Sequence, residues 1–286
     1  MIGVARLAER KAVIALAWAA LTLPAALVAL PTGGVLAAVL GSGEGGDATL
    51  FTPGGETLVE ATRLSVAPLI GTLVSAPWLL LAAALFGLVP WATVMVALSS
   101  PAPLSTGVAI GRAIARVPAL TLVFGAGLAV RALLLAGGSG LVGWMSTFSP
   151  NARTSALWSL VAVALTSVVL AGVRLASDLS EAAVVRHEST AARGTLAGLG
   201  ALHRRFAPLA LRFAAYAAAR VAIVAAAAVL AGRVGVATPS HLALVFGVHQ
   251  VTLLGLCALR AAWLRVALDA VGAEDPARAI EAGFAA

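Results

Sequence analysis

Charged residues are scarce in this chain of 286 residues, where they make up 11% of the sequence and hydrophobic residues make up 61%. Soluble domains carry about 25% charged residues. No charged residue occurs from Ala12 to Gly43 or from Leu64 to Gly111. Both stretches exceed the roughly 20 apolar residues that cross a bilayer as a helix. The composition therefore excludes a soluble globular protein and predicts a polytopic membrane protein.

Cysteine is limited to Cys257, and a single cysteine excludes both an intrachain disulfide and a cysteine metal cluster. His187-Glu188 begins the pattern of a zinc-protease helix, but Ala191 stands where that motif needs its second histidine. No other complete catalytic motif occurs in the sequence. We therefore expect no metal, no cofactor and no enzymatic activity.

Six apolar segments are present, each long enough to cross about 30 Å of hydrocarbon as a helix. They lie at about residues 12–30, 69–97, 117–136, 155–175, 207–231 and 242–268, and none contains Asp or Glu. The predicted fold is an all-α bundle of six transmembrane helices. It forms a single integral membrane domain over residues 1–286.

Basic residues are distributed unevenly between the two sides of such a bundle. One side holds Arg63, Arg131, Arg153 and Arg233, while Arg220 lies within a span. An excess of Lys and Arg marks the cytoplasmic side, so we predict a bacterial inner-membrane protein with both termini in the cytoplasm. The predicted cytoplasmic segments hold Arg6, Arg10, Lys11, Arg112, Arg116, Arg174, Arg186, Arg193, Arg204, Arg205, Arg212, Arg260, Arg265 and Arg278.

The net charge of +7 and the pI of about 11.3 could suggest a nucleic-acid partner. In so apolar a chain, however, arginines are typical of the cytoplasmic rim of the membrane rather than of a phosphate-binding face. We therefore expect the lipid bilayer as a partner, together with protein partners in a membrane complex, and no nucleic acid.

Two predicted cytoplasmic segments have a helical pattern. Residues 107–117 contain Arg112 and Arg116, and residues 180–206 contain Arg204 and Arg205, in each case among apolar residues. Both are expected to form amphipathic helices that lie in the membrane interface. Gly107/Gly111 and Gly194/Gly198 are small-xxx-small steps, which allow close helix packing.

The chain also aligns with itself at an offset of 89 residues. Residues 106–136 then match residues 195–225, with Arg116 on Arg205, Phe124 on Phe213 and Arg131 on Arg220. One interpretation is a parallel repeat of an interfacial helix followed by two spans. The alternative is convergence, because any outgoing span preceded by an amphipathic helix begins with arginine.

Polar residues within membrane spans are candidates for function because their burial in lipid is costly. Arg131 is expected close to the outer rim, where its side chain can reach the interface. Arg220 lies deeper, and His249 and Gln250 lie in the last span. Each has a structural alternative, in which it reaches the interface or forms a hydrogen bond between helices.

The second half of the chain resembles a loose group of bacterial six-span membrane proteins of unknown function. The residues that carry this resemblance are Asp178 and Glu181 after the fourth span, an amphipathic segment ending in Arg204-Arg205, and two further spans with Gln250. The resemblance implies a six-span fold and an acidic turn after the fourth span, and it implies no activity.

Three functional hypotheses follow. The first is a structural or accessory subunit of a membrane assembly. The second is a transporter or permease-like subunit that moves a polar or anionic solute past Arg220, His249 and Gln250, and Glu181-Ala-Ala183 resembles the ATPase-docking loop of ABC importers. The third is an intramembrane serine protease, because Gly137-Gly-Ser139-Gly140 resembles the rhomboid serine motif.

Overall fold

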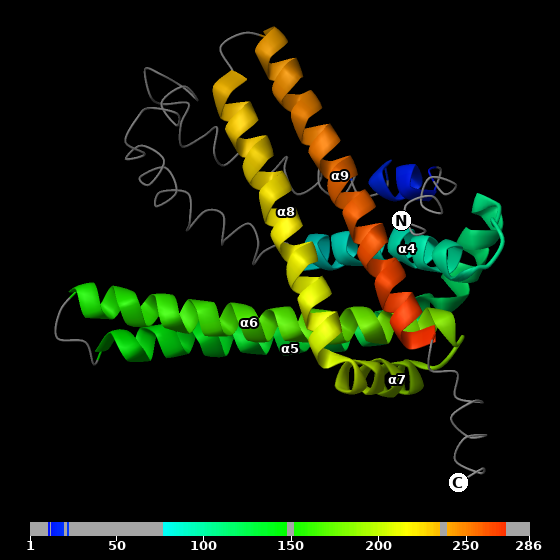
Figure 1. The fold of residues 1–286 in the computed structure, drawn as a ribbon, viewed down its shortest axis with the longest axis horizontal. Coiled ribbons are helices and arrows are strands. Elements are labelled where there is room, and N and C mark those ends of the chain that lie inside the picture. Colours follow the sequence, from blue (N-terminus) through cyan, green and yellow to red (C-terminus); the bar gives the residue numbers. More distant parts are fainter. Residues whose placement is uncertain are drawn as a thin grey trace. The chain divides into compact units, whose positions relative to one another are not determined.

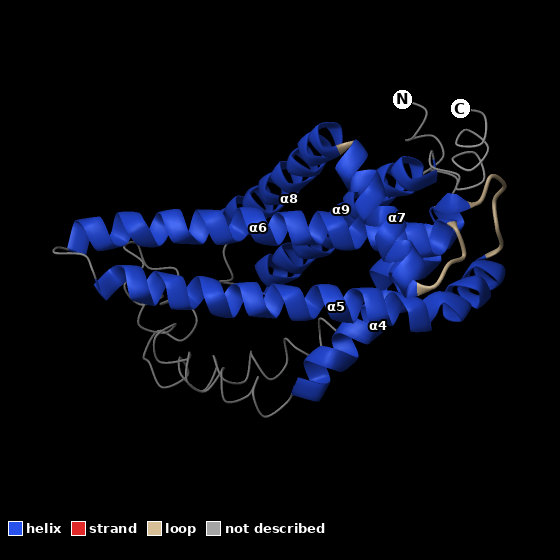
Figure 2. Ribbon diagram, turned by 90° about the horizontal axis from the view of Figure 1, so that it is seen from below, coloured by secondary structure: helices blue, strands red, loops and turns tan. Residues whose placement is uncertain are grey.

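The computed structural model describes residue 11, residues 13–19, residue 22, and residues 77–147, 152–234 and 239–272. Every regular element in these ranges is a helix (Figure 2), which confirms the all-α prediction. The helices of the longer ranges, coloured by sequence in Figure 1, are α4 (Pro77–Ser99), α5 (Thr106–Thr147), α6 (Ala152–Arg186), α7 (Ala191–Arg204), α8 (Phe206–Val234) and α9 (Pro239–Gly272).

Four segments of the described helices are long and apolar enough to cross a membrane. They are Thr106–Leu141, Leu157–Arg186, Phe206–Val234 and Ala243–Gly272. The chain is therefore a helical membrane protein. The first predicted span lies mostly outside the described residues, and the second overlaps α4, which has 23 residues. The count of six spans stays a prediction.

The chain divides into two compact units. The first comprises residues 1–94 and 217–261, and the second comprises residues 95–216 and 262–286. In the first unit Arg260 on α9 is buried, and its guanidinium carbon lies 5.9 Å from the ring centroid of Trp91 on α4. This distance is typical of a cation–π interaction.

The second unit is built on an antiparallel pair of long helices, α5 and α6, which lie side by side in both ribbon views (Figures 1 and 2). Its register is set by three contacts that join Arg116 to Glu188, Gly127 to Ser177 and Gly138 to Thr166. Each contact is eleven residues from the next along both segments, and the Glu188 contact lies just beyond the end of α6. Eleven residues are close to three helical turns, so one face of each helix contacts the other throughout.

Several boundaries differ from the prediction. Residues 107–117 are the continuous beginning of α5 and form no separate interfacial helix. Residues 137–147, expected in a loop, complete the same helix, and the acidic residues expected in a turn lie within α6. The physical reason is helix–helix packing: charged and glycine-containing segments stay helical because their neighbours in the pair α5–α6 support them.

Helix α7 is a separate helix that runs back along the end of α6. Gly194 faces Val184 and Gly198 faces Ser180, and Gly194, Gly198 and Ala201 are the buried residues of α7. The predicted close packing of the Gly194/Gly198 step is confirmed. The Gly107/Gly111 step forms no such contact, because a side chain at either position would meet no neighbouring atom within 4 Å.

The two segments of the proposed repeat differ in local structure. Residues 106–136 form one unbroken stretch of α5, whereas residues 195–225 are interrupted between α7 and α8 at Arg205. Arg205 aligns with Arg116, which lies inside the unbroken helix. The repeat therefore stays a prediction based on the sequence.

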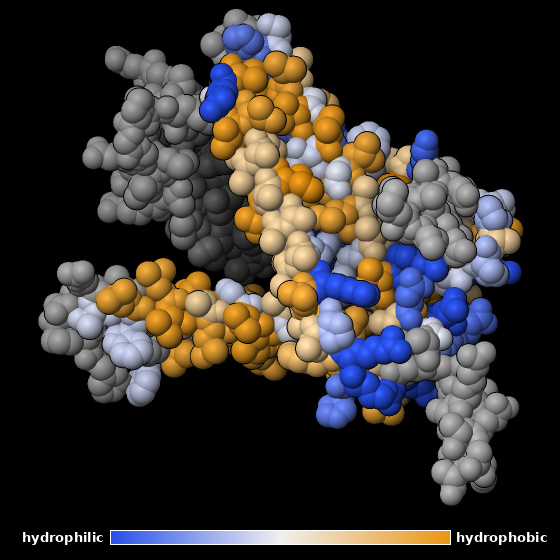
Figure 3. Space-filling model, viewed as in Figure 1, coloured by the Kyte–Doolittle hydropathy of each residue, from blue (hydrophilic) through white to orange (hydrophobic). Residues whose placement is uncertain are grey.

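Burial changes abruptly along α6. Large apolar side chains between residues 157 and 169 are mostly exposed, and Val168 is 69% exposed. From Leu175 to Val185 almost every side chain is buried. Figure 3 shows hydrophobic residues along the α5–α6 pair and hydrophilic residues gathered around α7. The second unit thus has an apolar part and a charged, well-packed part.

Candidate functional site

The candidate site is the charged end of the second unit, defined as residues 95–131, 174–216 and 262–272. These segments contain four carboxylates and ten arginines: Asp178, Glu181, Glu188 and Asp269, with Arg112, Arg116, Arg131, Arg174, Arg186, Arg193, Arg204, Arg205, Arg212 and Arg265. Residues 132–173 contain one charged residue, Arg153. Nearly all the charge of the second unit's described residues therefore lies at one end.

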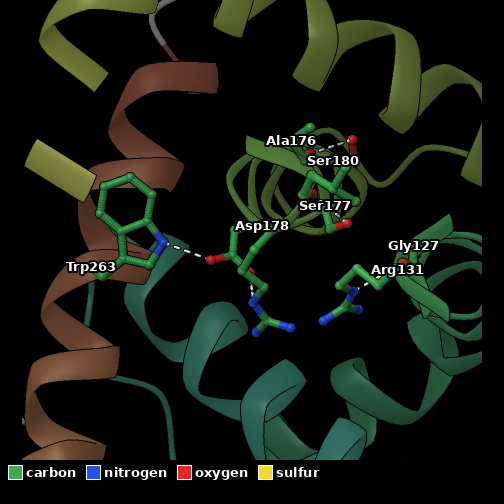
Figure 4. Close-up of polar contacts among 9 residues, drawn as sticks. Gly127, Arg131, Ala176, Ser177, Asp178, Ser180 and Trp263 are labelled. Atoms are coloured by element: carbon green, nitrogen blue, oxygen red, sulfur yellow. Dashed lines mark hydrogen bonds and ion pairs between the residues drawn. The ribbon is translucent and has the colours of Figure 1, made fainter. Parts of the chain in front are cut away.

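Asp178 is the centre of this end. Its side chain is fully buried, and its two carboxylate oxygens have different partners. Nε of Arg174, one turn earlier on α6, lies 3.0 Å from Oδ1. Nε1 of Trp263 on α9 donates a 2.8 Å hydrogen bond to Oδ2 (Figure 4). A buried charge is tolerated when it is paired and hydrogen-bonded, and here the pairing also joins α6 to α9.

Two further arginines, one on α6 and one on α9, bind backbone carbonyls at the end of α4. Nη1 of Arg186 on α6 donates a 2.9 Å hydrogen bond to the carbonyl oxygen of Ser99. Arg265 on α9 donates to the carbonyl oxygen of Leu98 and also pairs with Asp269, 3.1 Å away. The last carbonyls of a helix have no partner within the helix, so arginines satisfy them here and fasten the end of α4.

The connection between α6 and α7 is fastened to α5. Nη2 of Arg116 lies 2.6 Å from Oε2 of Glu188, and its Nη1 donates a weaker 3.4 Å bond to the Glu188 carbonyl oxygen. Glu188 has a positive φ of 50°, which side-chain-bearing residues adopt infrequently. The double contact from Arg116 holds this turn in place.

An aromatic cluster lies beside the buried carboxylate. The ring centroid of Phe213 is 5.0 Å from that of Trp263, which is edge-on to it, and Tyr216 stacks on Trp263 at 5.7 Å. All three side chains are buried. The cluster packs the beginning of α8 against the end of α9 and fixes the indole that donates to Asp178.

Arg131 and Arg174 do not have the relative positions predicted for them. The sequence placed Arg131 near the outer rim and placed Arg174 at the inner rim. In the structure Nε of Arg131 donates to the carbonyl of Gly127, and Gly127 contacts Ser177 (Figure 4). Arg131 is therefore level with Arg174, and the prediction that they lie at opposite rims is wrong. The cause is the helix register, which the apolar pattern of a single helix does not reveal.

The predicted interfacial arginines divide into two kinds. Arg116 is engaged with Glu188, and Arg204 lies over Gly200, with Nη2 3.1 Å from the position a Cβ would take there. Arg112 and Arg205 are exposed, and neither guanidinium has a hydrogen-bond or ion-pair partner among the described residues. The exposed ones remain available to a ligand or a surface outside the chain.

The three candidates in the later spans all belong to the first unit. Arg220 on α8 and His249 on α9 are exposed, and Gln250 is half-buried. Each therefore keeps some contact with the surroundings of the chain, and none of the three is enclosed in the protein interior.

Two motif interpretations lose their structural basis. Glu181, Ala182 and Ala183 are buried within α6, so they present no docking loop for an ATPase. Ser139 lies on α5, where its hydroxyl donates a 2.9 Å hydrogen bond to the carbonyl oxygen of Ala136. The serine is thus part of a regular helix, not of the loop expected from the glycines.

The described residues contain no group of three or more His, Cys, Asp or Glu side chains that could hold a metal ion. None of the four carboxylates of the charged end lacks a partner. Chemically, the arrangement can brace helix ends and offer cationic groups to an anion.

Sequence reasoning did not identify Trp263 or the central role of Asp178. Asp178 was assigned to a turn beyond the fourth span, and Trp263 was counted only as part of the last span. One available signal was the spacing of Arg174 and Asp178, because residues four apart face each other on a helix. The partner on α9 could not be inferred, since the two positions are 85 residues apart.

No model of a known protein family matches the chain, and no curated protein or solved structure matches it.

Proposed function

We propose that this protein is a six-span protein of the bacterial inner membrane that serves as a structural or accessory subunit of a membrane assembly. The observation that carries the proposal is that both oxygens of the buried carboxylate Asp178 are bound within the protein. Its oxygens bind Arg174 and Trp263, so the group braces α6 and α9. A site for catalysis or transport would instead keep such a group available to a substrate.

The positive-inside rule supports a cytoplasmic location for the charged end. The position of Arg131 supports this assignment. Because Arg131 is level with Arg174, the predicted outer side has one arginine fewer and the side of Arg174 has one more. Both termini are then cytoplasmic, as the distribution of basic residues predicts.

The inner surface of the bilayer would lie at the level of Arg131 and Arg174. The segments beyond it, residues 132–147 of α5 and 152–173 of α6, contain only Arg153 as a charged residue. At 1.5 Å per residue they span about 24 to 33 Å, close to the thickness of the hydrocarbon core. The remaining part of α6, from Leu175 onward, would project into the cytoplasm with α7 beside it.

A braced cytoplasmic end with lipid-facing helices suits a subunit that positions other proteins. In this region the end of α4, the middle of the charged part of α6 and the α6–α7 connection are joined to other helices through Ser99, Asp178 and Glu188. Such cross-links oppose relative sliding of the helices within the second unit. A transporter that uses Arg220, His249 and Gln250 remains the alternative hypothesis.

Affinity purification of the tagged full-length chain in a mild detergent, followed by mass spectrometry, tests the proposal. We expect at least one membrane or envelope protein to co-purify with the chain in a fixed molar ratio. Recovery of the chain alone, together with solute uptake that depends on Arg220 in reconstituted vesicles, would support transport instead.

A further inference from the structure

The charged end carries more positive charge than its own four carboxylates neutralise. Ten arginines face four carboxylates there, which leaves an excess of six positive charges. The carboxylates have partners within the chain. Four exposed arginines have no hydrogen-bond or ion-pair partner for their guanidinium groups among the described residues: Arg112, Arg193, Arg205 and Arg212. This excess is available to an anion outside the chain.

Two of these arginines frame the start of α8. Arg205 immediately precedes the helix, and Arg212 follows seven residues later, which is nearly two turns. Both arginines therefore lie within two turns of the start of α8. The first turn of α8 contains no acidic residue that would repel an anion there.

Exposed apolar side chains adjoin both arginines. Phe206, which follows Arg205, is 61% exposed, and Leu211, which precedes Arg212, is 73% exposed. A soluble anion such as phosphate would gain nothing from these neighbours. A phospholipid has a charged phosphate next to apolar chains, and so it matches the alternation of guanidinium and apolar groups.

We propose that the junction of α7 and α8 binds anionic phospholipid headgroups. Arg205 and Arg212 would bind the phosphates, and Phe206 and Leu211 would contact the glycerol and upper acyl region.

This inference requires that the chain lie in a membrane, but it does not depend on membership of an assembly. Lipid binding can be measured on the isolated full-length protein, whereas the assembly requires partners from the cell. Failure of one proposal therefore leaves the other testable.

The test is native mass spectrometry of the full-length protein in detergent, titrated with phosphatidylglycerol or with phosphatidylcholine. We expect tighter binding of phosphatidylglycerol. The double variant Arg205→Gln/Arg212→Gln should weaken this binding roughly 30-fold, from about 5-fold per arginine near a membrane surface. The charge-preserving variant Arg205→Lys/Arg212→Lys should stay within a few-fold of the wild type.

The matched control is Arg233→Gln, which removes an exposed arginine from the other end of α8 and should leave binding unchanged. Should the double glutamine variant fail to fold, Arg212→Gln alone should weaken binding about 5-fold. Equal binding of the two lipids, or unchanged binding in a folded glutamine variant, would overturn the proposal. Displacement of phosphatidylglycerol by an equal concentration of glycerol phosphate would also overturn the proposal, because it would indicate a site for soluble anions.

Discussion

Nε1 of Trp263 on α9 donates a hydrogen bond of 2.8 Å to Oδ2 of Asp178 on α6, across 85 residues of sequence. The acceptor is fully buried and also pairs with Arg174, so the bond has a charged acceptor in a region of low dielectric constant. Hydrogen bonds to charged groups are stronger than those between neutral groups. This contact is therefore expected to contribute substantially to the stability of the charged end.

Removal of the buried carboxylate is the first prediction. Asp178→Ala should lower the free energy of unfolding by about 2–4 kcal/mol, because the Trp263 indole is left buried without its acceptor and Arg174 loses its ion pair. Thermal unfolding in detergent can be followed with a thiol-reactive dye, since Cys257 is the only cysteine and is buried.

Asp269→Asn is the matched control, because Asp269 is also paired with an arginine four residues away, but 62% of its side chain is exposed. Exposed ion pairs contribute about 1 kcal/mol or less. Equal losses of unfolding free energy in Asp178→Ala and Asp269→Asn would contradict the prediction that burial strengthens the contacts of Asp178.

The contact between α6 and α7 gives the second prediction. A Cβ at position 198 would lie 2.6 Å from the backbone nitrogen of Ser180, and backbone cannot rotate away. Gly198→Ala should therefore destabilise the protein by about 1–3 kcal/mol despite the better helix propensity of alanine. Gly111→Ala, where nothing lies within 4 Å, should be neutral or stabilising in the same unfolding assay.

Two adjacent glycines of α5 give the third prediction. A Cβ at Gly138 would lie 2.7 Å from both Oγ1 and Cγ2 of Thr166, whereas a Cβ at Gly137 would meet nothing within 4 Å. Gly138→Ala should destabilise by about 1–3 kcal/mol, while Gly137→Ala should stabilise by up to about 1 kcal/mol as a helical position. A loss of stability in Gly137→Ala would indicate that this segment is a loop, as the sequence alone suggested.

The sequence predicted those features that depend on local composition. Apolar length identified the membrane helices, and the spacing of Gly194 and Gly198 identified the packed face of α7. Properties that depend on how two helices pair could not be predicted from the sequence. The level of Arg131 follows from the register with α6, and an apolar pattern repeats along a helix without fixing which turn faces which.

The candidate site was predicted only in part. Arg116 was predicted to be an interfacial basic residue, but its partner Glu188 could not be deduced, because the two are 72 residues apart. Glu181 was interpreted as part of a docking loop, yet it is buried in α6. Charged residues are usually exposed, so a sequence pattern favours the loop unless the covering helices are known.

Arg131 and Arg174 lie at one level, which we propose is the cytoplasmic boundary of the membrane. Single cysteines introduced at positions 131, 153 and 174 of a Cys257→Ala protein can be tested with a small, membrane-impermeant thiol reagent on spheroplasts and on inverted vesicles. We predict labelling of positions 131 and 174 from the cytoplasmic side and of position 153 from the outer side. Labelling of position 131 from the outer side, together with position 153, would contradict the account.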